Sequence, residues 1–337
     1  MIIDALKHIL AGQDLAFDEM VTVFDQIMSG KASDAQIGGF LIGLRMKGET
    51  ATEVAAAASV MREKATKIMA PEGNILDTCG TGGDGQSSFN ISTAVALVAA
   101  GAGVCVAKHG NKSVSSKSGS ADALAQLGVN INADLNKAQT AMKEANVGFL
   151  FAPMIHGAMK YAIGARKQLA QRTIFNMLGP LTNPAGAKHQ LLGVFSTEAQ
   201  DKMAKALLDL GTTHAMLVCS QDGMDEISIS APTRVLEICN NAIKEIVITP
   251  EDFGVQSVVD ADLSVPSSKD SAKLIADIID GVQTDYRRDI VLINAAAAIY
   301  VADRADNFIN AMQMAREAIS SGGARVALDK LIAISNS

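Results

Sequence analysis

The chain has 337 residues, of which 48% are hydrophobic but only 4% aromatic, and its net charge is −7. This length allows one large or two smaller domains, each with a core built mainly from aliphatic side chains. The acidic balance argues against nucleic-acid binding, which needs a basic face. It does not exclude an anionic small molecule, because a few local cations or a metal ion can reverse the sign of the field at one site.

The cysteines and the N-terminus indicate a soluble cytoplasmic protein. The four cysteines form no Cys-x-x-Cys pair, so we expect neither a disulfide scaffold nor a zinc site, and free thiols suit a reducing compartment. The first residues, MIIDALKHILAG, contain charges within a short apolar stripe, which is typical of an amphipathic helix and not of a signal peptide. No uninterrupted apolar run reaches about 18 residues, so no membrane span is expected.

Residues 1–70 predict a small all-helical subdomain. Apolar residues recur there at helical spacing, as in the first ten residues and again over 21–28. Ser33 with Gln36, and Thr50 with Glu53, have the spacing of capping boxes and are expected to open two helices. A later stretch at about 165–185 is a possible further contribution to this subdomain.

Residues 71–337 predict an α/β domain with a central, mostly parallel sheet flanked by helices. Short apolar runs (NILDTCG, GVCVAKHG, VGFLFAP, QLLGVF and HAMLVCS) alternate there with alanine-rich helical stretches. The segment 233–248 differs, because two β-rich runs flank Asn240-Asn241, and it predicts an antiparallel hairpin. Residues 254–267 are the expected long loop. In such sheets, ligands bind beyond the carboxyl ends of the strands.

A glycine-rich loop follows the first predicted strand. Four glycines occur within residues 80–85, and the run Asn90-Ile91-Ser92-Thr93 then opens a helix. Glycines let backbone N–H groups crowd around an anion, and a helix N-terminus adds partial positive charge. The order strand, glycine loop, helix therefore predicts a phosphate or pyrophosphate site, although its spacing matches neither Walker A nor the dinucleotide fingerprint.

A second polar loop, residues 108–120, follows the next predicted strand. It contains three lysines, five serines and two glycines. Ammonium groups, hydroxyls and backbone amides are the donors that surround a phosphate. Because the carboxyl ends of parallel strands share one edge of a sheet, we expect the two loops to converge on a ligand with two separated phosphate groups.

Acidic and basic side chains complete the candidate site. Asp225 and Glu226 follow the predicted strand HAMLVCS, where paired carboxylates can hold Mg²⁺. Arg166 lies in a predicted helix beside apolar residues, so it either binds a ligand carboxylate or is a cation near a helix C-terminus. His156 is either ligand-facing or a half-buried structural histidine. The remaining histidines without a partner pattern are interpreted as structural: His8, His189 and His214.

Taken in order, the motifs resemble those of the anthranilate phosphoribosyltransferase family. They are AQIGGFLIGLRMKGET, GTGGDG, FNIST, KHGN, VSSKSGSAD, RTIFNMLGPLTNP and GMDEIS, and they extend over essentially the whole chain. The resemblance implies a pentosyltransferase of tryptophan biosynthesis. In the implied reaction, the amine of anthranilate displaces pyrophosphate from phosphoribosyl pyrophosphate (PRPP). The resemblance also implies a homodimer formed through the helical subdomain.

The resemblance implies a role for each matching residue. Those implied to bind PRPP are Gly80, Gly83, Asp84, Ser88, Asn90, Ile91, Ser92, Thr93, Lys108, His109, Gly110, Asn111, Lys112, Ser113, Val114, Ser115, Ser116 and Ser120. Those implied to bind anthranilate are Gly80, His109, Asn111, His156, Arg166 and Pro180. Those implied to hold Mg²⁺, as two ions per monomer, are Ser92, Asp225 and Glu226. No single acid or base is expected, because the amine of anthranilate is already neutral at pH 7.

The chain departs from the family pattern at Met154–Gly157, where Ile155 and Gly157 stand in place of a histidine and a proline. This departure predicts a more apolar and more mobile outer channel for anthranilate. Two alternatives remain at this point. A pyrimidine-nucleoside phosphorylase shares the architecture but carries a KHSTGG-type loop, which is absent here. A binding protein that has lost the chemistry, such as a nucleic-acid binder, is opposed by the net charge and by the acidic pair Asp225-Glu226.

Overall fold

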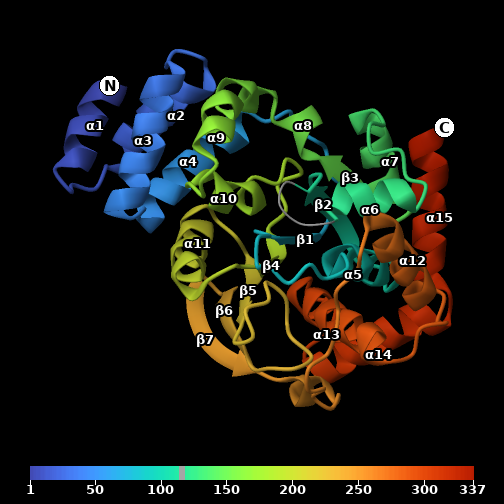
Figure 1. Cartoon of the computed structure of the whole chain (residues 1–337). Coiled ribbons are helices and arrows are strands. Elements are labelled where there is room, and N and C mark those ends of the chain that lie inside the picture. Colours follow the sequence, from blue (N-terminus) through green and yellow to red (C-terminus); the bar gives the residue numbers. More distant parts are fainter. Residues whose placement is uncertain (114–117) are drawn as a thin grey trace.

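The N-terminal part of the chain forms a bundle of four helices. The computed structural model describes residues 1–113 and 118–337. The bundle consists of α1 (Ile2–Leu10), α2 (Phe17–Met28), α3 (Asp34–Lys47) and α4 (Ala51–Lys64), seen at the upper left of Figure 1. The side chains of Ser33 and Thr50 accept hydrogen bonds from the backbone N–H groups of Gln36 and Glu53, which confirms both predicted capping boxes.

A seven-stranded sheet forms the centre of the rest of the molecule, with the strand order β3-β2-β1-β4-β5-β6-β7. Neighbouring strands are parallel from β3 to β5, whereas β6 and β7 are antiparallel, so both the mostly parallel sheet and the hairpin are confirmed. Asn240 and Asn241 take φ values of +51° and +58°, as a two-residue hairpin turn requires. The strands are β1 (Ile75–Gly80), β2 (Cys105–Gly110), β3 (Val147–Phe151), β4 (His189–Gly193), β5 (His214–Ser220), β6 (Thr233–Cys239) and β7 (Ala242–Ile248).

Helices cover both faces of this sheet (Figure 1). Alternate strand residues enter different cores: Met216 and Val218 pack in one cluster, while Leu217 packs in the other, as the two-residue period of a strand dictates. No described helix has both the length and the apolar character needed to cross a bilayer. The remaining helices are α5 (Ile91–Gly101), α6 (Ser120–Gln126), α7 (Leu135–Glu144), α8 (Ala152–Ile155), η1 (Gly157–Tyr161), α9 (Ile163–Leu169), α10 (Phe175–Leu178), η2 (Gly179–Leu181), α11 (Thr197–Asp209), η3 (Pro250–Phe253), α12 (Ser268–Ile279), α13 (Tyr286–Val301), α14 (Phe308–Ser320) and α15 (Gly323–Asn336).

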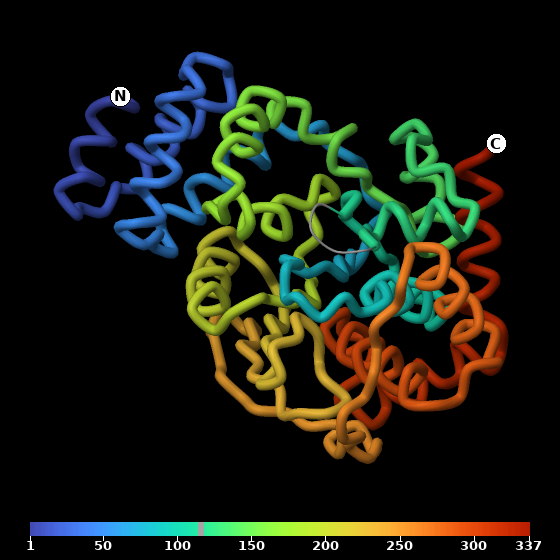
Figure 2. The backbone as a smooth tube through the Cα atoms, viewed as in Figure 1, coloured from blue at the N-terminus to red at the C-terminus, as the bar shows by residue number. Residues whose placement is uncertain are grey.

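The segment 163–181 returns from the sheet to the N-terminal bundle, as the chain trace in Figure 2 shows. Its helix α9 packs on α3, and the ring of Phe175 in α10 lies 5.5 Å from the ring of Phe24 in α2. Phe175 and Phe24 are both buried in one hydrophobic cluster. This segment therefore connects the helical bundle to the sheet edge at which β1 and β4 end.

Candidate active site

The glycine loop after β1 closely approaches the loop after β5. The N–H of Gly82 donates a hydrogen bond of 2.8 Å to Oδ2 of Asp225. A Cβ atom on Gly80 would lie 2.7 Å from Asp225 Oδ2, and one on Gly193 would lie 1.5 Å from the Asp225 carbonyl oxygen. The backbone contact at Gly193 leaves no room for a side chain, and a side chain at Gly80 would displace the Asp225 carboxylate, so the two glycines allow Asp225 to approach the ends of β1 and β4.

Three carboxylates gather at this point: Asp84, Asp225 and Glu226. Burial, followed by the charge of Asp84, raises the pKa of Asp225 to about 7. Burial and the charge of Asp225 raise the pKa of Glu226 well above its usual range. Within the described part of the chain, the buried Oδ2 of Asp84 has no hydrogen-bond partner. Crowded, incompletely paired oxygen ligands of this kind suit a hard divalent cation.

Lys108 lies beneath the glycine loop and does not project into the open polar loop. Its side chain is buried, and Nζ donates to the Thr78 carbonyl at 2.6 Å and to Ser92 Oγ at 3.1 Å. Burial lowers the pKa of Lys108, although the nearby acidic groups oppose this shift. Lys108 therefore links β1 and β2 to the start of α5, where Ser92 lies.

Hydrogen bonds and core packing around residues 88–93 fix the start of α5. The side chain of Ile91 is buried in the hydrophobic core, so only its backbone is available to a ligand. The Thr93 hydroxyl bonds to the side-chain oxygen of Asn90, and the Asn90 N–H donates to Ser271 Oγ at 2.9 Å. Ser88 pairs with Ser264 in an isolated antiparallel bridge.

The second polar loop is closed at its base by Asp122. One carboxylate oxygen of Asp122 accepts from the N–H groups of Ser113 at 2.9 Å and Gly119 at 3.1 Å. A Cβ atom on Gly110 would lie 2.1 Å from Ser120 Oγ, so β2 ends in close contact with the start of α6. Asn111 and Lys112 begin the loop, with Lys112 N donating to Asn111 Oδ1. The predicted residues Val114, Ser115 and Ser116 lie outside the described residues.

His109 and His156 form a buried, uncharged pair. Their Nε2 atoms are 3.2 Å apart, so one ring must donate the hydrogen bond and the other accept it. Burial is the main cause that lowers the pKa of His109 to about 3 and of His156 to about 4. The structure therefore brings together two predicted residues, and both are neutral imidazoles at neutral pH.

Arg166 lies in α9 with its guanidinium 4.8 Å from the centre of the Phe175 ring. Burial lowers its pKa, and among the described residues no carboxylate forms an ion pair with it. A half-buried guanidinium that stacks on a ring and lacks an acidic partner can receive a ligand carboxylate. The predicted Pro180 lies in η2, at the end of the same segment 163–181.

The predicted apolar contribution of Ile155 to the outer channel is not seen, because this side chain is buried. Its side chain is only 1% exposed and packs in a cluster with Ile68 and Leu150. An isoleucine in that position is held by core packing, so it adds no apolar surface to an open channel. At Gly157, by contrast, a Cβ atom would meet nothing within 4 Å.

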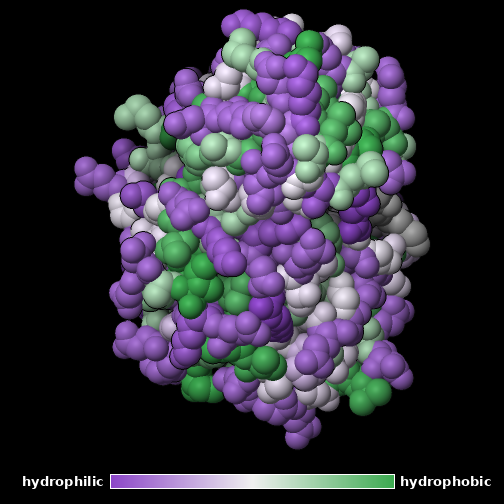
Figure 3. Space-filling model, turned by 90° about the vertical axis from the view of Figure 1, so that its left-hand side faces the viewer, coloured by the Kyte–Doolittle hydropathy of each residue, from purple (hydrophilic) through white to green (hydrophobic). Residues whose placement is uncertain are grey.

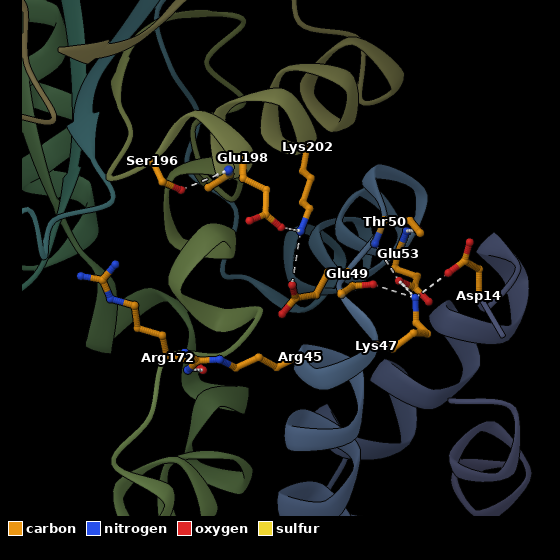
Figure 4. Close-up of polar contacts among 12 residues, drawn as sticks. Asp14, Arg45, Lys47, Glu49, Thr50, Glu53, Arg172, Ser196, Glu198 and Lys202 are labelled. Carbon is orange, nitrogen blue, oxygen red and sulfur yellow. Dashed lines mark hydrogen bonds and ion pairs between the residues drawn. The ribbon is translucent and has the colours of Figure 1, made fainter. Parts of the chain in front are cut away.

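Sequence reasoning missed Arg172, which lies beside Arg45 of the helical bundle (Figure 4). Its guanidinium donates to the carbonyl of Gly83 and lies 4.5 Å from the centre of the Phe195 ring. Its own backbone carbonyl accepts a hydrogen bond from Arg45 of α3. Arg172 thus ties the glycine loop to the helical bundle. The available signal was a lone arginine at the head of RTIFNMLGPLTNP, but the sequence does not reveal its partners.

Two family models match this chain. The helical bundle domain of the glycosyl transferase family matches residues 3–65, and the a/b domain of the same family matches residues 72–325. Fold and site together therefore define a glycosyl transferase built from a helical bundle and an α/β domain.

Similarity to relatives and to solved structures identifies the family within this class of glycosyl transferases. The chain is 50% identical to the anthranilate phosphoribosyltransferase of Thioalkalivibrio sulfidiphilus, over 99% of this chain and 98% of the relative. It is 51% identical to that of Teredinibacter turnerae, over 98% of each chain. The crystal structure of the Thermus thermophilus enzyme superposes with a TM-score of 0.94 at 37% identity, covering 99% of this chain and 100% of that one. The Saccharomyces cerevisiae enzyme in complex with PRPP and Mg superposes with a TM-score of 0.91 at 27% identity, covering 99% and 98%. The chain belongs to the anthranilate phosphoribosyltransferase family.

Proposed function

We propose that this protein transfers the phosphoribosyl group of PRPP to the amine of anthranilate. The products are N-(5-phosphoribosyl)anthranilate and pyrophosphate, and the reaction belongs to tryptophan biosynthesis. One observation carries the proposal: the glycine loop contacts the carboxylate cluster where β1 and β5 end, and the segment 163–181 lies beside them. That segment contains Arg166, which has no acidic partner among the described residues. The relatives with about half of their residues identical carry the same name.

PRPP is the ligand we assign to the two polar loops. The glycine loop and the start of α5 offer backbone N–H groups, and the loop after β2 offers ammonium, hydroxyl and amide donors. Ser120, at the first position of α6, lies against the end of β2. The residues that we propose for this role are Gly80, Gly83, Asp84, Ser88, Asn90, Ser92, Thr93, Lys108, His109, Gly110, Asn111, Lys112, Ser113, Val114, Ser115, Ser116 and Ser120, together with the backbone alone of Ile91.

Magnesium fits the carboxylate cluster. Asp225, Glu226 and the hydroxyl of Ser92 would hold the ion, and the unpartnered oxygen of Asp84 would be available as a further ligand. We propose two ions per monomer, since three carboxylates provide enough negative charge for more than one cation. When bound, Mg²⁺ neutralises charge on the pyrophosphate and makes it a better leaving group.

We assign anthranilate to the space between the segment 163–181 and the ends of β1 and β2. Arg166 would bind its carboxylate, because its guanidinium is oriented by Phe175 and has no acidic partner in the described structure. The neutral pair His109 and His156, with Pro180, would line the aromatic ring. Gly80 and Asn111 would contact the ligand from the two loop bases.

The reaction requires positioning and electrostatic stabilisation, without a strong base. The neutral amine attacks C1 of the ribose, the bond from C1 to the pyrophosphate oxygen breaks, and the amine then releases its extra proton to solvent. Positive charge builds on the ribose ring while negative charge builds on the leaving group. Backbone N–H groups and lysines stabilise the leaving group, and Arg166 fixes the direction of attack. No side chain is assigned as a single acid or base.

We further propose that the protein is a cytoplasmic homodimer that associates through a helical subdomain of residues 1–70. Five large hydrophobic side chains remain exposed on or beside the first three helices: Met1, Ile3, Leu10, Phe17 and Met46. Figure 3 views the side of the molecule that contains these helices, and hydrophobic residues gather there among hydrophilic ones. Exposed apolar surface of this kind is typical of an association face. The four unpaired cysteines suit a reducing compartment.

A direct assay tests the proposed function. Anthranilate fluorescence should fall when the protein is mixed with PRPP and Mg²⁺, and it should stay constant when any one component is omitted. Turnover of thymidine with phosphate, but not of anthranilate with PRPP, would instead indicate a nucleoside phosphorylase. Retention of single-stranded DNA on a filter, with no turnover in either assay, would indicate a binding protein.

A further inference from the structure

A cavity of about 380 Å³ lies at the sheet edge opposite the candidate active site. It is formed by the residues that precede β4 and β5, at 183–188 and 210–212, and by the chain just around the end of α4. The candidate active site lies where β1, β2, β4 and β5 end. Because these strands are parallel, the cavity lies at their N-terminal ends and the candidate active site at their C-terminal ends.

Three cations contribute to the wall of the cavity: Arg62, Lys67 and Lys188. Among the residues that the structure describes, no aspartate or glutamate does. In a chain of net charge −7, a site with three cations and no carboxylate is a local reversal of sign. A cavity of this polarity attracts anions and disfavours cations.

Arg62 carries its charge into this cavity without a compensating acid. Its Nε donates to the Leu181 carbonyl at 2.6 Å and its Nη1 donates to the Leu210 carbonyl at 3.4 Å. The described residues place no carboxylate within ion-pair distance of it, and burial alone lowers its pKa. The two carbonyls fix the guanidinium in one orientation but leave it without an acidic partner, so an anion bound beside it would gain a charge-assisted contact.

Thr212 adds a neutral donor to the same wall. It is 8% exposed and belongs to the cavity lining. A threonine hydroxyl can donate one hydrogen bond, so Thr212 offers a neutral donor to an anion in the cavity. Lys188 lies at the mouth of the cavity as an exposed lysine without a described ion pair.

We propose that this cavity binds a small molecule through a carboxylate or phosphate group, held by the guanidinium of Arg62, the hydroxyl of Thr212 and the ammonium of Lys188. Its volume of about 380 Å³ accommodates a compact metabolite. Arg62 also holds Leu181, the residue after Pro180, so the site adjoins the segment assigned to anthranilate. The binding proposal itself does not depend on the proposed reaction.

Anion titration of matched variants tests this proposal. Inorganic phosphate and succinate are titrated calorimetrically into the full-length protein, without PRPP or Mg²⁺, to distinguish phosphate from carboxylate preference. The test variant is the double substitution Lys188→Gln with Thr212→Val, which leaves the carbonyl contacts of Arg62 intact. The control is Lys269→Gln, which removes an exposed lysine of α12 far from the cavity lining.

All three proteins retain the candidate active site, so anion binding there is the same in each. A difference in binding between the proteins therefore reports on the cavity. We expect wild type and Lys269→Gln to bind one more equivalent of at least one probe, and the double variant to bind that equivalent about tenfold or more weakly. Identical stoichiometry and affinity in all three proteins, for both probes, would overturn the proposal. Circular dichroism of the double variant must match wild type, and Lys188→Gln alone provides a milder substitution if it does not.

Discussion

At the scale of single residues, Arg166 is the side chain whose role can be measured most cleanly. It has a ring beneath it and no described acidic partner, so removing it leaves no buried carboxylate behind. We expect Arg166→Ala to raise the anthranilate KM by about 10- to 140-fold, which corresponds to the loss of about 1.5–3 kcal/mol from a charge-assisted pair. The PRPP KM should change little. Steady-state kinetics with each substrate varied in turn measures both constants, and equal rises in the two would contradict the assignment.

Arg172 acts on the other substrate through the backbone. Its guanidinium donates to the carbonyl of Gly83, so it restrains the glycine loop without facing the proposed anthranilate position. We expect Arg172→Ala to raise the PRPP KM several-fold while the anthranilate KM stays near its wild-type value, because a looser loop presents its N–H groups less well. Arg172→Lys should recover only part of the loss, since an ammonium cannot both stack on Phe195 and reach Gly83. A PRPP KM that is unchanged in the alanine variant would show that the contact does not position the loop.

At the scale of elements, substitutions in the loop 221–226 can show whether its carboxylates act by binding a metal ion. The double substitution Asp225→Asn with Glu226→Gln replaces two carboxylates by amides of nearly the same size. In wild type, burial and the charge of Asp84 raise the pKa of Asp225 to about 7. We expect this double variant to unfold at a temperature equal to or above that of wild type when no metal is present, because like-charge repulsion is relieved. It should also need far more Mg²⁺ for half-maximal rate at fixed PRPP. If the Mg²⁺ midpoint did not move and an ionisation vanished from the pH–rate profile, a general-base role would replace the metal role.

Elements with local signals could be predicted from the sequence, and contacts between distant segments could not. The capping boxes at Ser33 and Thr50 and the Asn240-Asn241 hairpin depend on residues within a few positions, and each is confirmed. The alternation of strands and helices likewise placed the loops after β1 and β5 at the same ends of the strands, where Gly82 bonds to Asp225. The hydrogen bond from Arg172 to Gly83 joins residues 89 positions apart, and that between His109 and His156 joins residues 47 apart. Such contacts are set by tertiary packing, which also buries the side chains of Ile91 and Ile155.

At the scale of the whole molecule, the exposed apolar residues of the bundle determine the expected assembly. Leu10 and Met46 are 80% and 84% exposed, and a side chain of that size in water favours association. We expect wild type to sediment as a dimer and the double variant Leu10→Glu with Met46→Glu to sediment largely as a monomer, because a two-fold interface would bury each new charge twice. The control Val282→Glu changes an equally apolar side chain, 71% exposed, between α12 and α13, and it should leave the dimer intact. Wild-type sedimentation as a monomer, or dimers in all three proteins, would contradict a dimer formed through the bundle.

Stability of the whole fold should depend on pH through His214, which joins β5 to β6 and to the turn after α13. Its ring nitrogens lie 2.7 Å from Asp303 and 3.2 Å from Glu237, with the rings of His189 and Tyr300 beside it. Burial disfavours the charged ring, but hydrogen bonds to Glu237 and Asp303 outweigh burial and raise the pKa of His214. The hydrogen bond from His214 is in turn the main cause that lowers the pKa of Glu237. The stabilisation by protonated His214 is therefore complete below its ordinary pKa of about 6.5, and it is lost as the pH rises through its raised pKa. The stabilisation by ionised Glu237 is lost in the opposite direction, as the pH falls below about 4.3.

We expect His214→Gln to reduce the free energy of unfolding by about 1 kcal/mol at pH 5.5, and by clearly less at pH 8.5, in urea titrations at both pH values. His8→Gln, which removes an exposed histidine paired with Glu19, should cost little at either pH. A His214→Gln deficit that stays constant or grows between pH 5.5 and 8.5 would show that packing, and not the charged pair, accounts for the effect.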